Sequence, residues 1–563
     1  MTMTNNVLEV SNLSVGFDLH HASIDVVKKV SFNLERGETL CVVGESGSGK
    51  SVTARALMRI AKPGKITSGS IRLYGEAGDV TDISKLDDMS AEMRAIRGDR
   101  IGMVFQEPMS SLSPVHTIGD QIIEAILLHR DMTPEQARQE AIESLRRVQI
   151  PNPENAMDKY SFEFSGGMRQ RAMIAMALSC EPEVLIADEP TTALDVTTQA
   201  EILRLIKRLQ RELGMSVIFI THDMGVVAEI ADRVAVMYHG ELVELGPVSE
   251  VFHRPQADYT RHLIGASSKF RIIGDHDRGG TLPPQHPDTL LDVKDLDLTF
   301  RKTTGFLFKK TQQFHALKKV SFSLLHGENL GIVGESGSGK TTLVRALVGL
   351  LTADSGSAIY TSKDGRQFDL LQPNALRNAG LNREIRMVFQ DPFSSLNPRM
   401  TVEQIIAEPL ILEGRQPKKE IREKVAHLLD RVGLPQNVMS RYPHAFSGGQ
   451  RQRISIARAL AVDPRLIIAD EATSALDGSI RSQILDLMFD LQSELGLSYI
   501  FVGHDLGVVR YFCDRIAVMH KGNLVEIGTA ADVCQKPQRD YTQKLISAVP
   551  GNDPDHRRLI AAE

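Results

Sequence analysis

The sequence predicts an α/β protein in which two similar domains follow one another along the chain. Three observations point to this class. A glycine-rich pattern, G-x-x-x-x-G-K-[ST], occurs twice, at Gly44–Ser51 and at Gly334–Thr341. After each copy, short apolar runs alternate with helical patterns, which favours a mainly parallel sheet flanked by helices. The chain has 563 residues, too many for one core and enough for about four compact units.

The two halves are related by an internal repeat. Lys340 follows Lys50 by 290 residues, whereas Tyr541 follows Tyr259 by 282 residues. From a shared F-S-G-G stretch onward the separation stays at 282 residues, so the halves differ by short insertions in their earlier parts, which belong in surface loops. The predicted division is domain 1 at residues 1–270, a linker rich in Gly, Pro and charge at 271–288, and domain 2 at 289–563.

Each half is expected to contain three kinds of substructure. Alternating apolar residues at Val7–Phe17 and at Leu290–Phe300 predict antiparallel edge strands ahead of the glycine loop. The later alternation of strands and helices predicts the parallel core sheet. The runs Thr117–Val148 and Thr401–Val432 are helical in pattern and carry no β signal, so they predict a separate helical subdomain.

Composition excludes several classes of protein. The net charge of −6 and the pI near 6.3 give no general attraction for nucleic acid. No run of eighteen apolar residues and no basic, apolar leader is present, so we expect a cytoplasmic chain that spans no membrane. Cys41, Cys180, Cys513 and Cys534 are scattered without a C-x-x-C pair, which predicts inert thiols in a reducing compartment.

The two glycine loops have the chemistry of a phosphate site. Glycines let successive N–H groups surround a phosphate, and the start of the following helix adds partial positive charge. Lys50 and Lys340 can reach the β- and γ-phosphates, and the hydroxyls of Ser51 and Thr341 can ligate Mg²⁺. The residues predicted to bind nucleotide are Gly44, Glu45, Ser46, Gly47, Ser48, Gly49, Lys50 and Ser51, with Gly334, Glu335, Ser336, Gly337, Ser338, Gly339, Lys340 and Thr341.

Two apolar runs, VLIADE and LIIADE, end in adjacent carboxylates. A buried parallel strand would deliver Asp188 or Asp470 beside the metal. Glu189 or Glu471 could then orient and polarise the attacking water. A helix-capping acid is the ordinary alternative, but finding the same pair at the same place in both halves disfavours it.

Glutamine and histidine recur at strand ends in both halves. Gln106 and Gln390 follow strand-like runs and are available to the metal or to water. His222 and His504 end further apolar runs, FITHD and FVGHD, so we expect each of them within reach of the γ-phosphate. A lone histidine is more often structural, but the repetition and the position favour the functional interpretation.

The stretches FSGGMRQR and FSGGQRQR each precede a helical pattern. Ser165 and Ser447 are predicted N-caps, and the glycines after them would expose N–H groups at a helix start. A simple glycine turn explains the cap. It does not explain the paired glycines or the basic residues that follow.

The order of glycine loop, glutamine, S-G-G, Asp-Glu, A-L-D and histidine resembles that of the ATP-binding domains of ABC (ATP-binding cassette) proteins. The resemblance covers nearly the whole chain, and six motifs recur twice. It implies two P-loop NTPase domains in tandem, each a RecA-like core with an antiparallel β edge and a helical subdomain. It also implies ATPase activity with ATP and Mg²⁺, the metal being held by Ser51, Gln106 and Asp188 and by Thr341, Gln390 and Asp470.

ABC domains pair head to tail, so the S-G-G turn of one domain completes the ATP site of the other. A helix start can bind the outward oxygens of a γ-phosphate only while the triphosphate is intact, so ATP would join the halves and hydrolysis would release them. The resemblance implies an intramolecular pseudo-dimer. In it the Lys50 site faces Ser447, Gly448, Gly449 and Gln450, and the Lys340 site faces Ser165, Gly166, Gly167 and Met168.

One departure from the family pattern affects the second site. Met168 stands where the family usually has Gln, and a methionine side chain donates no hydrogen bond. We expect both sites to hydrolyse ATP, the Lys340 site with altered affinity. The family also stacks adenine on an aromatic residue, for which Phe17, Phe300 and Phe314 are candidates that spacing does not separate.

Two longer phrases narrow the resemblance. QEPMSSLSP with QDPFSSLNP, and RPQADYTRHLI with KPQRDYTQKLI, resemble the ATPases of peptide/nickel-type importers. The fusion of two domains is similar to the ATPases of microcin-type and glutathione-type peptide importers. It implies a peripheral protein on the cytoplasmic face of the inner membrane, two transmembrane permease subunits as partners, and indirectly a periplasmic solute-binding protein. The cysteine spacing predicts no iron–sulfur cluster.

Alternatives stay open at this point. The solute could be another member of the same group, such as an oligosaccharide, nickel or an opine. A soluble tandem ABC factor acting on ribosomes is disfavoured because residues 271–288 are short and broken by Pro and Gly, and no partner nucleic acid is expected. Export is disfavoured only by the subfamily phrases.

Overall fold

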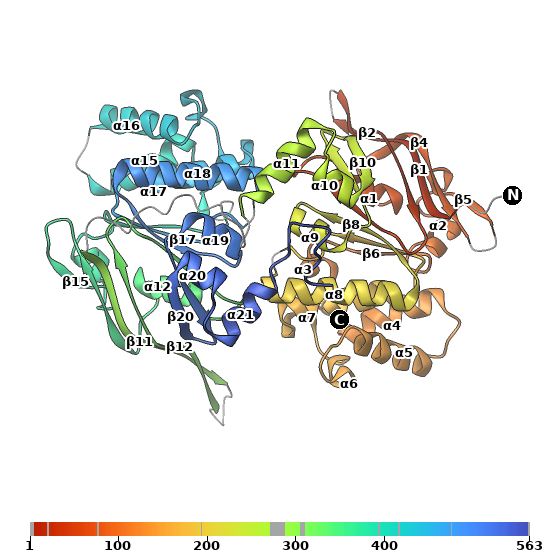
Figure 1. Ribbon diagram of the computed structural model, residues 1–563, viewed down its shortest axis with the longest axis horizontal. Helices are drawn as coiled ribbons and strands as arrows, with labels where there is room; N and C mark the ends of the chain where they lie inside the picture. The colour runs from red at the N-terminus through yellow and green to blue at the C-terminus, as the bar shows by residue number, and fades with distance from the viewer. Residues whose placement is uncertain are drawn as a thin grey trace. The chain divides into compact units, whose positions relative to one another are not determined.

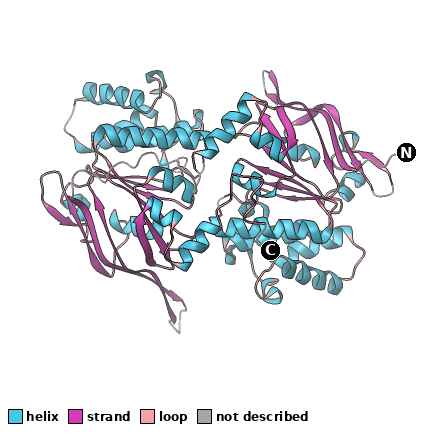
Figure 2. Cartoon of the chain, in the orientation of Figure 1, coloured by secondary structure: helices cyan, strands magenta, loops and turns pink. Residues whose placement is uncertain are grey.

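The computed structural model describes residues 5–19, 22–75, 78–192, 194–270, 288–304, 310–391, 395–414, 417–474 and 476–560. It consists of two compact units. Unit 1 comprises residues 1–194, 198–268 and 548–563, and unit 2 comprises residues 195–197 and 269–547. Figure 2 shows strands gathered into sheets with helices on their faces in each unit. The units are described one at a time.

Unit 1 has a six-stranded sheet in the order β10-β9-β3-β8-β7-β6. All its neighbouring strands are parallel except β9 and β10. Strands β3, β7 and β8 are buried along their whole length, which is why their sequences are continuous apolar runs. The strands are β3 (Thr39–Val43), β6 (Ile101–Val104), β7 (Val184–Asp188), β8 (Ser216–Thr221), β9 (Arg233–Tyr238) and β10 (Glu241–Pro247).

A second, antiparallel sheet in unit 1 has the order β2-β1-β4-β5. Its strands are β1 (Asn6–Leu19), β2 (Ala22–Glu35), β4 (Lys65–Tyr74) and β5 (Val80–Asp82). The predicted edge strand at Val7–Phe17 lies within β1. One hydrophobic core joins this sheet, the parallel sheet and the helix α1 (Lys50–Leu57), so the helix that follows the glycine loop is fixed from both sides.

The helical part of unit 1 follows β6. Helices α4, α5 and α7 pack on one another, and Thr117 and Thr133 close capping boxes at the starts of α4 and α5. The helices of unit 1 after α1 are α2 (Ala91–Ile96), α3 (Pro108–Ser111), α4 (Ile118–His129), α5 (Pro134–Arg147), α6 (Pro153–Ala156), α7 (Gly166–Leu178), α8 (Val196–Leu213), α9 (Met224–Ile230), α10 (Val248–His253) and α11 (Asp258–Ser268), with 3-10 turns η1 (Ile83–Lys85) and η2 (Ser161–Glu163).

Unit 2 repeats this plan, with sheets in the orders β16-β17-β18-β13-β19-β20 and β12-β11-β14-β15 (Figure 1). Its own core again combines both sheets with the helix after the glycine loop. The strands are β11 (Thr289–Thr304), β12 (Lys310–Leu325), β13 (Asn329–Val333), β14 (Ser355–Thr361), β15 (Gln367–Asp369), β16 (Ile385–Val388), β17 (Leu466–Asp470), β18 (Ser498–Val502), β19 (Arg515–His520) and β20 (Asn523–Thr529).

The helices of unit 2 correspond to those of unit 1. Helices α15, α16 and α17 form the helical part, as α4, α5 and α7 do in unit 1. The helices are α12 (Lys340–Leu347), α13 (Ala375–Asn378), α15 (Val402–Glu413), α16 (Lys418–Arg431), α17 (Gly448–Leu460), α18 (Gly478–Leu495), α19 (Leu506–Phe512), α20 (Ala530–Gln535) and α21 (Asp540–Ser547), with 3-10 turns η3 (Gln436–Val438) and η4 (Pro443–Ala445).

The segment 548–560, which follows the second repeat in sequence, packs in unit 1. Glu229 of α9 is 1% exposed, and its carboxylate accepts hydrogen bonds from the backbone N–H groups of Gly551 (2.8 Å), Arg558 (3.2 Å) and Leu559 (3.0 Å). The Leu559 side chain is fully buried. The division at residues 270 and 289 did not include this return to unit 1. The predicted linker, apart from residue 288, lies outside the described residues.

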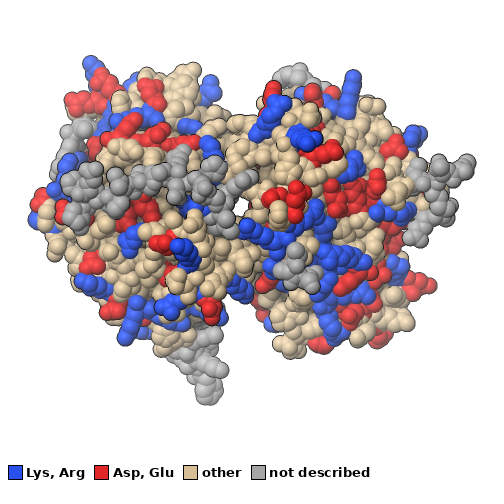
Figure 3. Space-filling model, viewed as in Figure 1, with Lys and Arg blue, Asp and Glu red and all other residues tan. Residues whose placement is uncertain are grey.

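The surface and the helices place limits on membrane contact. Lys and Arg side chains are interspersed with Asp and Glu on the face shown in Figure 3. Within the described part of the chain, every helix is too short or too polar to cross a bilayer. All four cysteines are buried and free.

Candidate functional site

The glycine loop of each unit connects the central strand of the parallel sheet to a helix. Gly44 and Gly49, at the two ends of the first loop, have φ angles of 149° and 98°. A Cβ on Gly44 would lie 2.2 Å from the backbone O of Met237, and a Cβ on Gly334 would lie 2.1 Å from that of Met519. Because no side chain fits there, both positions require glycine.

The loop lysines lie inside the loops. Lys50 Nζ donates to the carbonyl oxygens of Gly44 (2.6 Å) and Glu45 (2.8 Å), and Lys340 Nζ does the same in unit 2 at 2.7 and 2.9 Å. Both side chains are buried, and burial lowers the pKa of Lys340. A buried ammonium in a cradle of backbone groups can pair with phosphate oxygens.

A tyrosine from the C-terminal part of each repeat supports the glycine loop. The Tyr259 hydroxyl accepts a hydrogen bond from the backbone N–H of Glu45 (3.0 Å), and its ring stacks on Tyr238 at 4.1 Å. In unit 2, Tyr541 accepts from Glu335 (3.1 Å), and burial raises the pKa of Tyr541 to about 12. Sequence reasoning missed this contact, although the D-Y-T phrases placed both tyrosines in register.

The carboxylate at the end of β7 fits a divalent cation. Asp188 is fully buried, and its Oδ1 accepts a hydrogen bond from Ser51 Oγ at 2.9 Å. Its Oδ2 is buried and has no hydrogen-bond partner. Burial raises the pKa of Asp188, and the neighbouring charge of Glu189 raises it further. Asp470 likewise accepts from Thr341, at 3.4 Å. A buried carboxylate with an open oxygen beside a hydroxyl is a suitable pair of ligands for Mg²⁺.

Glu189 is held by the two residues that the sequence placed at the same rim. Gln106 Nε2 donates to Glu189 Oε2 at 3.0 Å, and His222 Nδ1 lies 3.2 Å from Glu189 Oε1. Burial opposes ionisation, but the hydrogen bond and charge of His222 outweigh it and lower the pKa of Glu189 to about 2. The carboxylate is therefore ionised at neutral pH and can orient a water molecule.

The backbone at this glutamate has an unusual conformation in both units. The φ angles are 47° at Glu189 and 48° at Glu471, in the left-handed region that residues other than glycine rarely adopt. Gln390 Nε2 donates to Glu471 Oε2 at 2.8 Å, and His504 Nδ1 lies 3.4 Å from the same oxygen. The predicted carboxylate, glutamine and histidine are thus brought together twice. No sequence signal predicted the strained backbone.

The S-G-G turns begin helices α7 and α17. Ser165 Oγ accepts from the N–H of Met168 (3.3 Å), and Ser447 Oγ accepts from that of Gln450 (3.4 Å). The Gln450 side chain also accepts from the Ser447 N–H at 3.1 Å, which completes a capping box that Met168 cannot form. Both serines are therefore N-caps, as the sequence predicted.

The second glycine of each turn is required by packing. A Cβ on Gly167 would lie 2.7 Å from Cγ2 of Thr198, and a Cβ on Gly449 would lie 2.4 Å from Cγ2 of Ile480. The neighbouring helix, α8 or α18, therefore approaches the turn more closely than any other residue allows.

The adenine-stacking candidates differ in exposure. Phe300 and Phe314 lie directly opposite each other on β11 and β12, with 43% and 61% of their surface exposed. Phe17 lies opposite Ile24 on β1 and β2 and packs against the core of unit 1. Nothing in this geometry chooses among them, and the choice stays open.

Comparison with known proteins identifies the family. The model of the family described as ABC transporter matches residues 27–192 and 317–474, more than half of the chain. The chain belongs to the ABC transporter ATP-binding family. The model described as oligopeptide/dipeptide transporter, C-terminal region, matches residues 243–290 and 525–563. These matches confirm the predicted fold class, the ATPase activity and the peptide-importer subfamily.

Relatives match along almost the whole chain. The glutathione import ATP-binding protein of Shigella flexneri is 50% identical over 98% of this chain and 91% of its own length. The protein of the same description from Escherichia coli O157:H7 is also 50% identical, and that of Escherichia coli strain K12 is 49% identical, with the same coverage. The family's ligand is ATP.

Proposed function

We propose that this chain is the ATPase subunit that drives import of glutathione or a similar short peptide through a membrane transporter. The 50% identity to glutathione import ATP-binding proteins over nearly the whole chain supports the solute class. The matched oligopeptide/dipeptide transporter region supports it independently. In this proposal the chain is peripheral at the cytoplasmic face of the inner membrane. Its partners are two permease subunits and, through them, a periplasmic solute-binding protein.

The duplicated network around Glu189 and Glu471 is the observation on which the catalytic proposal rests. In each unit a glutamate in a left-handed conformation contacts a glutamine and a histidine beside a metal-binding aspartate. The proposed Mg²⁺ ligands are Ser51, Gln106 and Asp188, and Thr341, Gln390 and Asp470. Mg²⁺ would supply the positive charge that neutralises the β- and γ-phosphate oxygens. The low pKa of Glu189 suits it to orienting water more than to accepting its proton.

The proposed arrangement of the two units is head to tail. The first turns of α7 and α17 carry no acidic residue, so the partial positive charge of each helix start is available to a γ-phosphate. In the proposal, Ser447, Gly448, Gly449 and Gln450 complete the Lys50 site. Ser165, Gly166, Gly167 and Met168 complete the Lys340 site. Covalent fusion would supply the effective concentration for this pairing.

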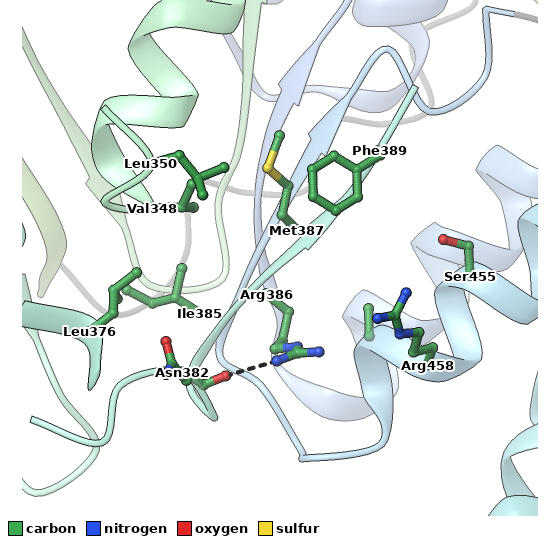
Figure 4. A pocket seen from close by; sticks show the side chains of 11 residues that line it. Val348, Leu350, Leu376, Asn382, Ile385, Arg386, Met387, Phe389, Ser455 and Arg458 are labelled. Atoms are coloured by element: carbon green, nitrogen blue, oxygen red, sulfur yellow. Dashed lines mark hydrogen bonds between the residues drawn. The ribbon is translucent and has the colours of Figure 1, made fainter. Parts of the chain in front are cut away.

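A pocket beside Gln390 is the proposed seat for a permease helix in unit 2. It has a volume of about 280 Å³ and lies between β16 and α17 (Figure 4). Apolar side chains line one side, among them Leu350 and Phe389, which are 61% and 40% exposed. Movement of Gln390 with the nucleotide state would reach a helix seated in this pocket.

Reconstitution tests the proposed function. The full chain is co-expressed with its two permease subunits, purified through a tag on the chain, and placed in liposomes with the solute-binding protein. We expect the three membrane-associated chains to co-purify and glutathione uptake to require ATP and Mg²⁺. The Glu189→Gln plus Glu471→Gln chain is the matched control, expected to assemble without transport. Co-sedimentation with ribosomes in place of permease co-purification would contradict the proposal.

Trapping tests the head-to-tail pairing. Cysteine pairs at Ser51 with Gly449, and at Thr341 with Gly167, place one thiol in each half of a predicted site. We expect the pairs to cross-link through a short bifunctional reagent in the Glu189→Gln plus Glu471→Gln background with ATP, and not without nucleotide. Pairs of Ser51 with Gly167 serve as the mismatched control. Equal cross-linking of matched and mismatched pairs would contradict the pairing.

A further inference from the structure

The pocket beside Gln390 contains a positive charge that the protein does not neutralise. Arg386 of β16 and Arg458 of α17 both line this pocket, and the Arg386 side chain extends from the strand toward the helix (Figure 4). The Arg386 Nη1 group donates to the backbone O of Asn382 at 3.3 Å, and its Nε is buried without an acceptor. Among the residues that the structure describes, no carboxylate lies within ion-pair distance of Arg386.

The nearby carboxylates are already paired with other arginines. Glu408 accepts from Arg458 at 2.8 Å, and Glu413 lies 2.6 Å from Nε of Arg383. Burial, followed by repulsion from Arg458, lowers the pKa of Arg386. A largely buried guanidinium with one weak backbone contact is unfavourable unless an anion meets it. The open side of the pocket is the side from which that anion can come.

Unit 1 has no such charge at the corresponding position. β6 and β16 pair with β7 and β17 in the same register, which places Gly102 at the position of Arg386. Met176 occupies the position of Arg458, since each lies eleven residues after the N-cap serine of its helix. A Cβ on Gly102 would lie 2.4 Å from the backbone O of Ala177, so unit 1 has no space for a side chain there.

We propose that the pocket of unit 2 receives a permease helix that carries an aspartate or glutamate, whose carboxylate pairs with Arg386. The corresponding surface of unit 1, with Gly102 and Met176, receives a helix that needs no acid at that point. The chain therefore distinguishes two different permease subunits and assigns the acidic one to unit 2. A planar guanidinium presents several donors to a carboxylate, so the pairing fixes the orientation of the helix as well as its identity. This inference rests on the proposed function, because it names the partner chemistry of the same docking surface.

The test uses the full chain co-expressed with its two permease subunits. We expect Arg386→Glu to reduce the permease recovered with the tagged chain at least tenfold, and Arg386→Gln to reduce it less. The ATPase rate of each isolated variant should stay within twofold of the unmodified chain, which shows that the fold is intact. Arg383→Gln is the matched control, since this arginine is 48% exposed and already paired with Glu413.

Charge reversal in the partner identifies the carboxylate. Each Asp and Glu in the cytoplasmic loops of the two permease subunits is changed to Lys and combined with Arg386→Glu. We expect one position, in one subunit only, to restore co-purification and uptake. Normal assembly of Arg386→Glu, or rescue from both subunits equally, would overturn the inference. Failure of the unmodified chain to recover any permease would instead contradict the proposed function.

Discussion

The buried carboxylate of Glu229 makes a sharp prediction about the segment 548–560. Glu229→Ala removes three hydrogen bonds from backbone N–H groups to a charged acceptor. Such bonds contribute roughly 1.5–3 kcal/mol each, so their simple sum is about 5–9 kcal/mol. A released segment regains water and chain entropy, which offsets part of this sum, and we expect a net loss of about 3 kcal/mol in docking free energy. Glu229→Gln keeps the shape and loses the charge, so it should show about half that loss.

Amide hydrogen exchange measures this loss directly. A reduction of about 3 kcal/mol corresponds to roughly 100-fold faster exchange of the amides in residues 548–560. The rest of unit 1 should keep its protection, because its two sheets and α1 form a separate core. Glu212→Ala, at a half-exposed position on α8, is the control. Unchanged exchange of the C-terminal amides in Glu229→Ala would refute the reasoning.

Three further predictions concern the nucleotide sites. Glu189→Gln and Glu471→Gln should each lower the ATPase rate at least tenfold at the altered site and retain bound ATP, because a neutral amide polarises water poorly; a full rate in Glu471→Gln would mark that site as silent. The lowered pKa of Glu189, about 2, means that its stabilising ionisation is lost only as pH falls from about 4.5 toward 2, so a thermal melt should show no Glu189-dependent change between pH 5 and 8. Tyr259→Phe removes the acceptor for the Glu45 N–H and should weaken ATP binding about fivefold, close to 1 kcal/mol, in a titration where Tyr74→Phe is neutral. Gly449→Ala should destabilise unit 2 by about 1–3 kcal/mol in thermal unfolding, and adding Ile480→Ala should recover part of it; no recovery would contradict the packing argument.

The sequence predicted most of the fold because the fold depends on local patterns. Continuous apolar runs marked β3, β7 and β8, and the repeat assigned the same plan to both halves. The residues around Asp188 and Glu189 could be grouped because parallel strands end at one edge of a sheet. Local pattern was sufficient for these features.

Other features depend on contacts between distant residues. Tyr259 meets Glu45 across 214 positions, and nothing beside either residue indicates that contact. Glu229 has the pattern of an ordinary helical acid, and only the tertiary structure reveals its three donors. The left-handed backbone at Glu189 is imposed by the packing around it, since glutamate has no preference for that region.

The discontinuity of unit 1 has a consequence for biosynthesis. Its sheets and helices are encoded by residues before 269, yet the donors for Glu229 come from residues 551–559. During translation, α9 must therefore wait with an unsatisfied carboxylate while the ribosome makes the whole of unit 2. Unit 1 is the first to begin folding and the last to finish.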